Sequence, residues 1–556
     1  MRGEGLNLSG CRALVVGLGD TGAACVRWLL EHDALVRGTD TRDEPPHAQH
    51  LREAFPEVAL SLGGFDPADF AWADLIVASP GVPLASSELQ TAIKSGKEVV
   101  GDVELFARAI AGKNAGKQPK VIAITGSNGK STVTSLVGHL CAAVGLETAV
   151  AGNIGLPVLD ALDNCETTPP RSQNQLAAPA RGTPDSYALK RYDSAAPRGG
   201  AVPALGRPGG GHVLGCDPDV WVLELSSFQL ETTYSLRPDA ATVLNISQDH
   251  MDRYASLDDY AAAKARVFGV EVKGKGPGAR EKPCIQVLNR DDPMVMAMAI
   301  PGQPQWTFGI MDKPPLAPGF FGLATHKNRL WLCEGDEVLL PVDKLPIAGL
   351  HNAANALAAL ALCRAIGLPY AGLIPALKTF TGLPHRVQRI GEVAGRIFYD
   401  DSKGTNVGAT AAALFGFTVP VVLIAGGDGK GQDFSPLKEA VKNTRAVVQI
   451  GRDGPLIEQA IAGACPVYRA ESMEEAVNQA FQLTKSGDAV LLSPACASWD
   501  MFRNYEHRAE VFIGAVEVLK VLRGESRRQQ ERRFRSAAIL SEERRQRDRR
   551  SKQHVS

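Results

Sequence analysis

The chain has 556 residues, of which 44% are hydrophobic and 22% charged, and its formal net charge is −1. This length predicts about three domains of roughly 150 residues each, with enough apolar residues for a core in each. No run of about 18 apolar residues occurs, which argues against a membrane span. The ten cysteines form no C-x-x-C pair and no signal peptide precedes them, so we expect neither a zinc ribbon nor a redox motif, and a cytoplasmic protein.

A first glycine-rich turn, Gly17 to Gly22, lies between an expected strand, Arg12 to Val16, and an apolar helix. A second strand then leads to Asp40. Glycines followed about 20 residues later by an acid are typical of folds that hold a nucleotide diphosphate at a helix start. Asp20 would repel a closely held phosphate, so a tight turn without a ligand is the alternative. A later strand ends at Ser79-Pro80-Gly81, where ligands of open α/β sheets bind.

A second glycine-rich loop, Gly126 to Thr132, has the sequence G-S-N-G-K-S-T. An apolar run leads into it, and residues with helical spacing follow. Strand, loop and helix in this order cradle phosphates, with Lys130 on the outer phosphates and the Ser131 hydroxyl on Mg²⁺. The general P-loop pattern places a glycine where Ile124 stands, so this loop is a short variant. A glycine-rich turn with a surface lysine is the alternative.

Two segments lack the pattern of a folded core. From about Cys165 to Cys216 the chain is rich in Pro, Gly, Ser, Ala and Arg without periodicity, which predicts a disordered insertion. Residues 524–556 are rich in arginine and poor in apolar residues, which predicts a disordered basic tail. Acidic residues dilute the charge of the tail and Phe534 is its only aromatic residue, so we expect no nucleic-acid partner.

Polar residues also follow the strands after the insertion. A buried strand, 220–224, ends at Glu224, and the next one leads through Asn245 to His250. We expect Ser131, Glu224 and His250 to gather beside the phosphate loop, where the oxygen ligands suit Mg²⁺. Taken singly, Glu224 could be a polar strand end and His250 a helix cap. Lys264, on a predicted helix, could be an ordinary solvated lysine.

From Ile397 onward, strands alternate with polar or glycine-rich loops, which is typical of a parallel sheet. These loops carry Lys403, Lys430 and the segment Ser493 to Asp500. We expect Lys403 and Lys430 to follow neighbouring strands and to point into one crevice, where an anionic amino acid would need their charge. Each could also be an ordinary surface lysine.

Eight motifs, taken in this order, resemble those of the Mur ligases, the ATP-dependent amino-acid ligases of peptidoglycan synthesis. They are T-G-S-N-G-K-S-T, E-L-S-S-F-Q-L-E, D-H-M-D-R, G-L-H-N-A-A-N, L-P-H-R, D-S-K-G-T-N, G-G-D-G-K-G-Q-D-F and S-P-A-C-A-S-W-D-M-F. The last three resemble the family member that adds D-glutamate. The resemblance extends from Leu8 to about Leu522, apart from the insertion.

The resemblance implies an α/β fold with three domains. These are a Rossmann-like UDP-binding domain (1–112), a P-loop ATPase-like central domain (113–383) and a Rossmann-like amino-acid-binding domain (384–523). It implies an ATP-dependent carbon–nitrogen ligase that adds D-glutamate to UDP-N-acetylmuramoyl-L-alanine through an acyl phosphate. ATP and Mg²⁺, at two sites, are the expected cofactors, and a monomer is expected.

The resemblance also implies residue roles. ATP would contact Gly126, Ser127, Asn128, Gly129, Lys130, Ser131, Thr132, Asn352, Arg386 and Asp401. The UDP substrate would contact Gly19, Asp20, Thr21, Asp40, Thr41, Arg42, Ser79, Pro80, Gly81 and Asn153. D-Glutamate would contact Lys403, Thr405, Lys430, Ser498, Trp499 and Tyr505. Gln388 stands where an acid is common in the family, so an ion pair there is in doubt.

The metal ligands implied by the resemblance are Ser131, Glu224, His250 and Lys264. Lys264 matches the carbamylated lysine of the family, in which CO₂ adds to the neutral amine and produces a carboxylate-like ligand. Such a lysine needs surroundings that disfavour its positive charge. Together with Lys130, the residues Glu224, His250 and Lys264 form the expected catalytic group.

Three alternatives stay open. A nicotinamide-dependent oxidoreductase would use the first glycine turn but would leave the phosphate loop, Glu224 and Lys403 without a role. An ATPase that depends on nucleic acid would use the basic tail, and its activity would fall steeply with salt. A sibling ligase, which adds another amino acid to a UDP-muramoyl precursor or glutamate to folate, is the nearest alternative.

Overall fold

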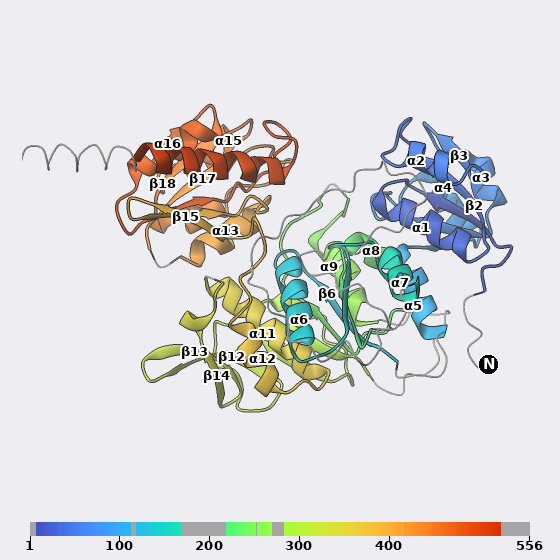
Figure 1. The fold of residues 1–556 in the computed structure, drawn as a ribbon, viewed down its shortest axis with the longest axis horizontal. Helices are drawn as coiled ribbons and strands as arrows, with labels where there is room; N and C mark the ends of the chain where they lie inside the picture. Colours follow the sequence, from blue (N-terminus) through green and yellow to red (C-terminus); the bar gives the residue numbers. More distant parts are fainter. Residues whose placement is uncertain are drawn as a thin grey trace, which may run out of the picture. The chain divides into compact units, whose positions relative to one another are not determined.

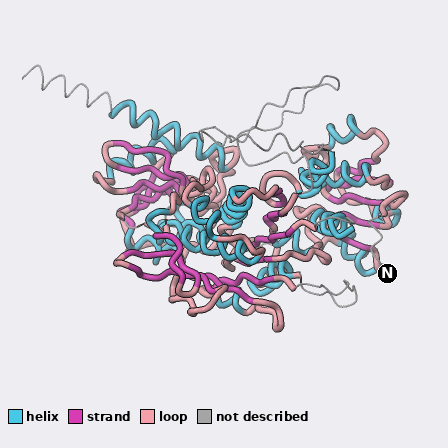
Figure 2. The backbone as a smooth tube through the Cα atoms, turned by 60° about the horizontal axis from the view of Figure 1, so that its bottom comes forward, coloured by secondary structure: helices cyan, strands magenta, loops and turns pink. Residues whose placement is uncertain are grey.

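The computed structural model describes residues 7–112, 118–167, 218–251, 253–269, 283–347, 349–417 and 419–523. The chain divides into two compact units (Figure 1). The first takes Met1–Ile347 and Asn352–Gly382, and the second takes Ala348–His351 and Leu383–Ser556. Two sheets lie in the first unit and one in the second, and helices flank the strands in each (Figure 2). None of the described helices is both long and apolar enough to cross a membrane.

The predicted insertion and the predicted basic tail lie almost entirely outside the described residues. Only the start of the insertion is described. There α7 (Val158–Thr167) continues past Cys165, whose side chain is buried. The helix extends two residues beyond Cys165, and the insertion predicted from about Cys165 stays a prediction.

The first sheet is parallel, with the order β3-β2-β1-β4-β5. Its strands are β1 (Arg12–Val16), β2 (Leu35–Asp40), β3 (Ala59–Leu62), β4 (Leu75–Ala78) and β5 (Glu98–Val100). Its helices are α1 (Asp20–Glu31), α2 (Ala48–Ala54), α3 (Pro67–Trp72) and α4 (Ser87–Lys94). Side chains of β1 alternate between two cores, Leu14 and Val16 on one face and Ala13 and Val15 on the other. Burial on both faces explains the continuous apolar run in its sequence.

The second sheet has nine strands in the order β14-β13-β12-β11-β10-β9-β6-β8-β7. They are β6 (Lys120–Thr125), β7 (Thr148–Gly152), β8 (Val220–Glu224), β9 (Ala240–Val243), β10 (Ile285–Asn289), β11 (Gln305–Phe308), β12 (Phe320–His326), β13 (Arg329–Glu334) and β14 (Glu337–Pro341). β12, β13 and β14 form an antiparallel meander, and β12 also pairs parallel with β11. The sequence predicts a strand at Leu330 to Leu332, within β13, and none at β12 or β14. Several of their residues are exposed, so their apolar pattern is weak.

Helices cover both faces of the second sheet. One core includes residues of α6 (Lys130–Ala143), α11 (Leu350–Ala365) and α12 (Tyr370–Leu377). The other includes residues of α5 (Asp102–Gly112), α7, α8 (Ser227–Glu231) and η2 (Arg266–Phe268), and it continues into the first sheet. The remaining elements are α9 (Leu257–Ala265), α10 (Pro293–Met296) and η3 (Val342–Lys344).

The second unit contains a sheet with the order β15-β16-β20-β17-β18-β19, in which only β15 is antiparallel. Its strands are β15 (Gln388–Val393), β16 (Arg396–Asp400), β17 (Val421–Gly426), β18 (Thr444–Ile450), β19 (Val467–Arg469) and β20 (Ala489–Leu492). One face packs on α13 (Val407–Phe415), α14 (Leu437–Ala440), η4 (Val441–Asn443) and α15 (Gly454–Ala460). The other packs on α16 (Met473–Leu483) and on the helix at residues 505–523.

This strand order corrects one prediction. Lys403 follows β16 and Lys430 follows β17, but β20 lies between these two strands. The two lysines therefore do not follow neighbouring strands. The chain returns to fill the position between them about sixty residues after β17, a crossover that local sequence patterns do not reveal.

Candidate active site

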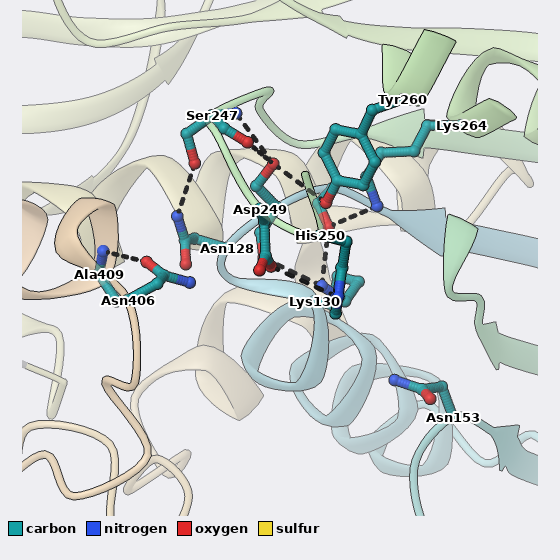
Figure 3. Close-up of polar contacts among 12 residues, drawn as sticks. Asn128, Lys130, Asn153, Ser247, Asp249, His250, Tyr260, Lys264, Asn406 and Ala409 are labelled. Atoms are coloured by element: carbon teal, nitrogen blue, oxygen red, sulfur yellow. Dashed lines mark hydrogen bonds and ion pairs between the residues drawn. The ribbon is translucent and has the colours of Figure 1, made fainter. Parts of the chain in front are cut away.

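The phosphate loop joins the end of β6 to the start of α6. Gly126 and Gly129 have φ of +149° and +83°, values that favour glycine. A Cβ on Gly126 would lie 3.0 Å from the Leu244 Cβ, so the loop also passes closely over the end of β9. Lys130 Nζ donates to the carbonyl oxygens of Gly126 (2.7 Å) and Ser127 (3.0 Å). The predicted strand–loop–helix cradle is therefore present, and its lysine folds over it (Figure 3).

Side chains that follow β9 hold the phosphate loop. Asn245 Oδ1 accepts from the Asn128 N–H (2.8 Å), and Asn245 Nδ2 donates to the Asn128 carbonyl (3.1 Å). The Ser127 hydroxyl donates to the Ser247 carbonyl (3.1 Å) and accepts from the Ser247 N–H (2.9 Å). Figure 3 shows Asn128 and Ser247 facing each other. Sequence analysis assigned Asn245 and Ser247 no role, because a polar residue after a strand gives no sign of its partner.

Lys264 lies beneath this loop and is only 1% exposed. Its Nζ donates to the Gly126 carbonyl (3.0 Å) and to Thr125 Oγ1 (3.3 Å), and lies 4.5 Å from the centroid of the Tyr260 ring. Burial, and then the charge of Lys130, hold the pKa of Lys264 well below its usual range. The interpretation of Lys264 as a solvated lysine is therefore wrong, and its surroundings favour the neutral amine.

Glu224 ends β8, directly beside the phosphate strand β6. It is 2% exposed, and Oε1 accepts from Asn153 Nδ2 (3.0 Å), while Oε2 has no hydrogen-bond partner among the described residues. A buried carboxylate oxygen without a partner is costly, and a cation is the kind of group that would satisfy it. This orphaned oxygen therefore fits a bound metal ion.

His250 follows β9, which lies on the other side of β6. Its Nε2 lies 3.6 Å from Asp249 Oδ2, and its ring makes an edge contact with Phe228. Among the residues that the structure describes, no three His, Cys, Asp or Glu side chains gather closely enough to hold a metal ion. A site at Glu224 and His250 would therefore depend on Ser131, which is buried, and on a modified Lys264.

Asn352 lies in the first turn of α11 and is buried. Its Oδ1 accepts from Asn355 Nδ2 (3.1 Å), and Asn355 in turn borders Gly129, where an added Cβ would lie 2.7 Å from Asn355 Oδ1. The start of α11 therefore adjoins the phosphate loop. Thr132 is buried in the first turn of α6.

In the first sheet, Asp40 connects β2 to the glycine turn. Its carboxylate accepts from the Leu18 N–H (2.8 Å) and from the Arg42 guanidinium (2.9 and 2.7 Å). Burial opposes ionisation, but the hydrogen bonds from Arg42 and Leu18 prevail and lower the pKa of Asp40. Ser79 Oγ donates to the Gly17 carbonyl (2.7 Å). The structure thus brings Asp40, Arg42 and Ser79 together around the turn, and their contact with the UDP substrate stays a prediction.

Other predicted substrate residues lie less closely together. Asp20 starts α1 after Gly19, and its side chain is 87% exposed and pairs with His47 (2.6 Å). Thr41, Gly81 and Asn153 are exposed, and Thr21 is half-buried. The outward direction of Asp20 removes the predicted repulsion from a phosphate, because its charge is in solvent.

Arg253 was not assigned a role from the sequence. Its guanidinium donates to the carbonyl oxygens of Pro80 (2.7 Å) and Val82 (3.2 Å) and to Glu231 (2.8 Å). It also lies 4.0 Å from the centroid of the Phe228 ring. Arg253 therefore ties the Ser79-Pro80-Gly81 turn to α8, the helix that follows Glu224. The long sequence separation hides this contact.

In the second unit, Asp401 is buried and accepts from the Ser493 hydroxyl (2.6 Å) and the Val387 N–H (3.3 Å). Burial, opposed by the Ser493 hydrogen bond and by Arg386, raises the pKa of Asp401 to about 7. Arg386 stands between His385 and Val387, whose φ values are +61° and +47°. Such backbone is rare for a β-branched residue and occurs where surrounding contacts impose it, often at functional sites.

The predicted D-glutamate residues divide into two groups. Lys403 Nζ lies 5.2 Å from the centroid of the Tyr505 ring, and Ser498 is buried at the end of the loop after β20. Thr405 is half-buried next to this loop region, whereas Lys430 and Trp499 (71%) are exposed. Gln388 Oε1 accepts from the His385 N–H (3.0 Å), so a backbone contact stands where an ion pair was in doubt.

Three Mur ligase families match successive parts of the chain. They are the Mur ligase MurD-like N-terminal domain (11–101), the Mur ligase middle domain (212–363) and the Mur ligase glutamate ligase domain (385–496). The UDP-N-acetylmuramoylalanine–D-glutamate ligase of Thiobacillus denitrificans is 51% identical over 94% of this chain and 100% of its own length. The protein of the same name from Chromobacterium violaceum is 50% identical over 92% and 98%. The chain belongs to the Mur ligase family.

Solved Mur ligases share this fold. MurF ligase from Thermotoga maritima in complex with ADP has a TM-score of 0.51 at 14% identity, covering 92% of this chain and 96% of its own. UDP-N-acetylmuramate-alanine ligase MurC from the same organism has a TM-score of 0.50 at 17% identity, covering 91% and 99%. Identities this low establish the fold alone. The predicted α/β class and three-domain Mur ligase architecture are confirmed, and the oxidoreductase alternative loses its basis.

Proposed function

We propose that this Mur ligase joins D-glutamate to UDP-N-acetylmuramoyl-L-alanine and consumes ATP in doing so. The names of its relatives support the choice of substrates. The geometry around Gly126 carries the chemistry, because the amines of Lys130 and Lys264 both donate to its carbonyl oxygen. A charged lysine on a phosphate loop and a buried lysine beside an orphaned carboxylate oxygen suit phosphoryl transfer rather than a structural turn.

ATP would bind along the phosphate loop, Gly126 to Thr132. Lys130 and the N-terminal turn of α6 would neutralise the phosphate charge, since helix N-termini favour anions. We assign Asn352, Arg386 and Asp401 to the remainder of the nucleotide. Asn352 has support from its contact, through Asn355, with Gly129.

Ser131, Glu224, His250 and Lys264 would hold Mg²⁺, at two sites. When bound, Mg²⁺ supplies positive charge that offsets the negative charge developing on the transferred phosphoryl group. The unsatisfied Glu224 Oε2 fits this role. Lys264 would take part as a carbamate, and the low pKa that burial imposes on it supports this because CO₂ adds only to the neutral amine.

The UDP end of the substrate would bind at the first sheet, with Gly19, Asp20, Thr21, Asp40, Thr41, Arg42 and the Ser79-Pro80-Gly81 turn. Asn153 would contact the substrate nearer to the reaction, since it hydrogen-bonds Glu224. In the second unit, Lys403, Thr405, Lys430, Ser498, Trp499 and Tyr505 would bind D-glutamate. The cations Lys403 and Lys430 suit its two carboxylates.

The reaction would have two steps. The alanyl carboxylate of the substrate attacks the γ-phosphorus of ATP, forming an acyl phosphate and ADP. The neutral amine of D-glutamate then attacks the acyl carbon, and loss of phosphate from the tetrahedral intermediate leaves the amide. No protein nucleophile is required, so the side chains act by positioning and by neutralising charge.

We further propose a cytoplasmic monomer. The nine cysteines that the structure describes are all free thiols, which fits a reducing compartment. We propose the domain limits 1–112, 113–383 and 384–523. The longer segment of the second compact unit begins at Leu383, inside the G-L-P-H-R segment, which supports the last of these limits.

The test is phosphate release from the purified protein with Mg-ATP and UDP-N-acetylmuramoyl-L-alanine, with amino acids added one at a time. Release only with D-glutamate, together with an amide product identified by mass, is the expected result. Release with another amino acid would instead favour a sibling ligase. If none of the amino acids leads to phosphate release, the ligase assignment is contradicted.

A further inference from the structure

The side-chain amide of Asn245 pairs with the backbone N–H and carbonyl of a single residue of the phosphate loop, Asn128. It accepts the Asn128 N–H (2.8 Å) and donates to the Asn128 carbonyl (3.1 Å), and the Asn245 carbonyl accepts the Ser127 N–H (2.9 Å). Two adjacent backbone N–H groups of the loop are therefore bonded to one residue. In the general phosphate loop, N–H groups of the loop point towards the bound anion.

The shortness of this loop gives the pairing its importance. Only Ser127 and Asn128 separate Gly126 from Gly129, and Ile124 stands within β6 where a longer loop would have its first glycine. Both intervening residues donate their N–H groups to Asn245. Asn245, which follows β9, therefore fixes the turn of this short loop. The groups left to bind phosphate are the start of α6 and Lys130.

Asn245 is itself held from both sides. The Leu244 N–H donates to the Thr125 carbonyl (2.9 Å), and the Leu244 carbonyl accepts from Asn289 Nδ2 (2.8 Å). On the other side, the Ile246 N–H donates to Asp292 Oδ2 (2.7 Å). Because its neighbours are fixed, the Asn245 amide is preorganised before any nucleotide binds.

We propose that Asn245 is a positioning residue that sets the phosphate loop in its nucleotide-binding conformation. A primary amide satisfies the N–H and the carbonyl of Asn128 at once, because it offers a separate acceptor oxygen and donor nitrogen. An amide also carries no charge, whereas a carboxylate at this position would face the Asn128 carbonyl and would repel phosphates. The proposal rests on the proposed function only in taking this loop as the site of ATP.

Two variants test this role. Asn245→Asp keeps the size of the side chain but replaces the donor with a negative oxygen, and Asn245→Ala removes the amide without adding charge. We expect the Kd for Mg-ATP, measured by calorimetry without other substrates, to rise about tenfold or more in Asn245→Asp and about fivefold in Asn245→Ala. The KM for the UDP substrate should change by less than about twofold, a selectivity that a general loss of structure would not produce.

The control is Asn478→Asp, which makes the same chemical change on the exposed surface of α16, where Nδ2 donates to the Glu474 carbonyl. It should bind ATP like the parent protein. Hydrogen exchange of a peptide covering residues 126–131 should be faster in ligand-free Asn245→Ala, even if the variant melts at a lower temperature. ATP affinity and loop exchange that match the parent in both variants would overturn the proposal. Failure of the unaltered protein to bind ATP would instead contradict the proposed function.

Discussion

The two glycine-rich turns of this Mur ligase are built alike but differ in charge. In each, a residue at or just after a neighbouring strand end binds the turn's backbone: Asp40 accepts the Leu18 N–H, and Asn245 accepts the Asn128 N–H. In each, the carbonyl of the first glycine also accepts from a side chain. At Gly17 that donor is the Ser79 hydroxyl, and at Gly126 the donors are the amines of Lys130 and Lys264.

The difference matches the ligands that we propose. Asp40, which binds the turn after β1 from the end of β2, has its charge balanced by Arg42, so this turn can hold a substrate through neutral and paired groups. At the loop after β6, the amines of Lys130 and Lys264 both donate to one carbonyl oxygen. Positive charge at Lys130 suits a polyphosphate with several negative charges.

The largest effect should come from Lys264, the buried lysine of α9 that donates to the Gly126 carbonyl and has no counterpart at the first turn. Lys264→Ala removes a buried amine and, under our proposal, a metal ligand. We expect kcat/KM to fall roughly 10²- to 10³-fold, the usual cost of losing a group that stabilises transition-state charge. Phosphate release with all substrates present measures this. Acetate or formate should restore part of the activity, and full activity without them would contradict the carbamate proposal.

A second effect contrasts Asp40 with a carboxyl that has no arginine beside it. Asp102 on α5 is buried, and Oδ2 accepts from Gln229 Nε2 (3.3 Å), whereas Oδ1 has no hydrogen-bond partner in the part of the chain that the structure describes. Burial raises the pKa of Asp102 to about 6. A carboxyl with a raised pKa in the folded chain costs no stability below about pH 4, and its cost grows as pH rises and is complete above about pH 6.

Asp102→Asn removes this cost. The free energy of unfolding should therefore rise at pH 8 by up to about 3 kcal/mol, and the gain should shrink towards pH 5. Denaturant unfolding at both pH values measures it. The matched control is Asp74→Asn, at an exposed acid whose pKa Arg12 lowers to about 2, and which should show no gain at pH 8. Equal gains in the free energy of unfolding for Asp102→Asn at both pH values would contradict a raised pKa of Asp102 in the folded chain.

In the third prediction, Asp40 is replaced by asparagine, so that a neutral amide binds the first turn as Asn245 binds the second. Asp40→Asn still offers an oxygen to the Leu18 N–H but loses the ionic part of its pairing with Arg42. Hydrogen bonds to charged groups contribute about 1.5–3 kcal/mol, so the KM for the UDP substrate should rise about tenfold to a hundredfold. The Kd for ATP should stay unchanged. A change in ATP affinity of similar size would show that the two turns do not act separately.

The smallest effect should come from Arg253, which holds the turn beside Ser79. Arg253→Met keeps the packing on Phe228 but loses the hydrogen bonds to the carbonyls of Pro80 and Val82. We expect the KM for the UDP substrate to rise about fivefold, with kcat changed less. Arg12→Met is the control and should leave this KM unchanged. Arg12 begins β1, at the end of the strand opposite to the glycine turn, and pairs with Asp74.

The comparison also shows how far sequence patterns extend. Both glycine turns were predicted, together with the strands before them and the helices after them, because glycine spacing and apolar periodicity are local. The antiparallel strands β12 and β14 were missed, since their exposed residues weaken the alternation. The placement of β20 between β16 and β17 was missed as well, because strand order depends on where distant segments pack.

For the candidate site, the sequence by itself determined which chemical groups are available and, through eight ordered motifs, the family to which the chain belongs. Local patterns also placed Glu224, His250 and Lys130 at strand or loop ends. Only the tertiary structure decided their state. It buried Lys264 beside Lys130, left one oxygen of Glu224 without a partner, turned Asp20 into solvent and paired Asn245 with Asn128. The physical reason is that burial and hydrogen-bond partners are set by neighbours that lie far away in the chain, and those neighbours decide whether a lysine is charged or a carboxylate is satisfied.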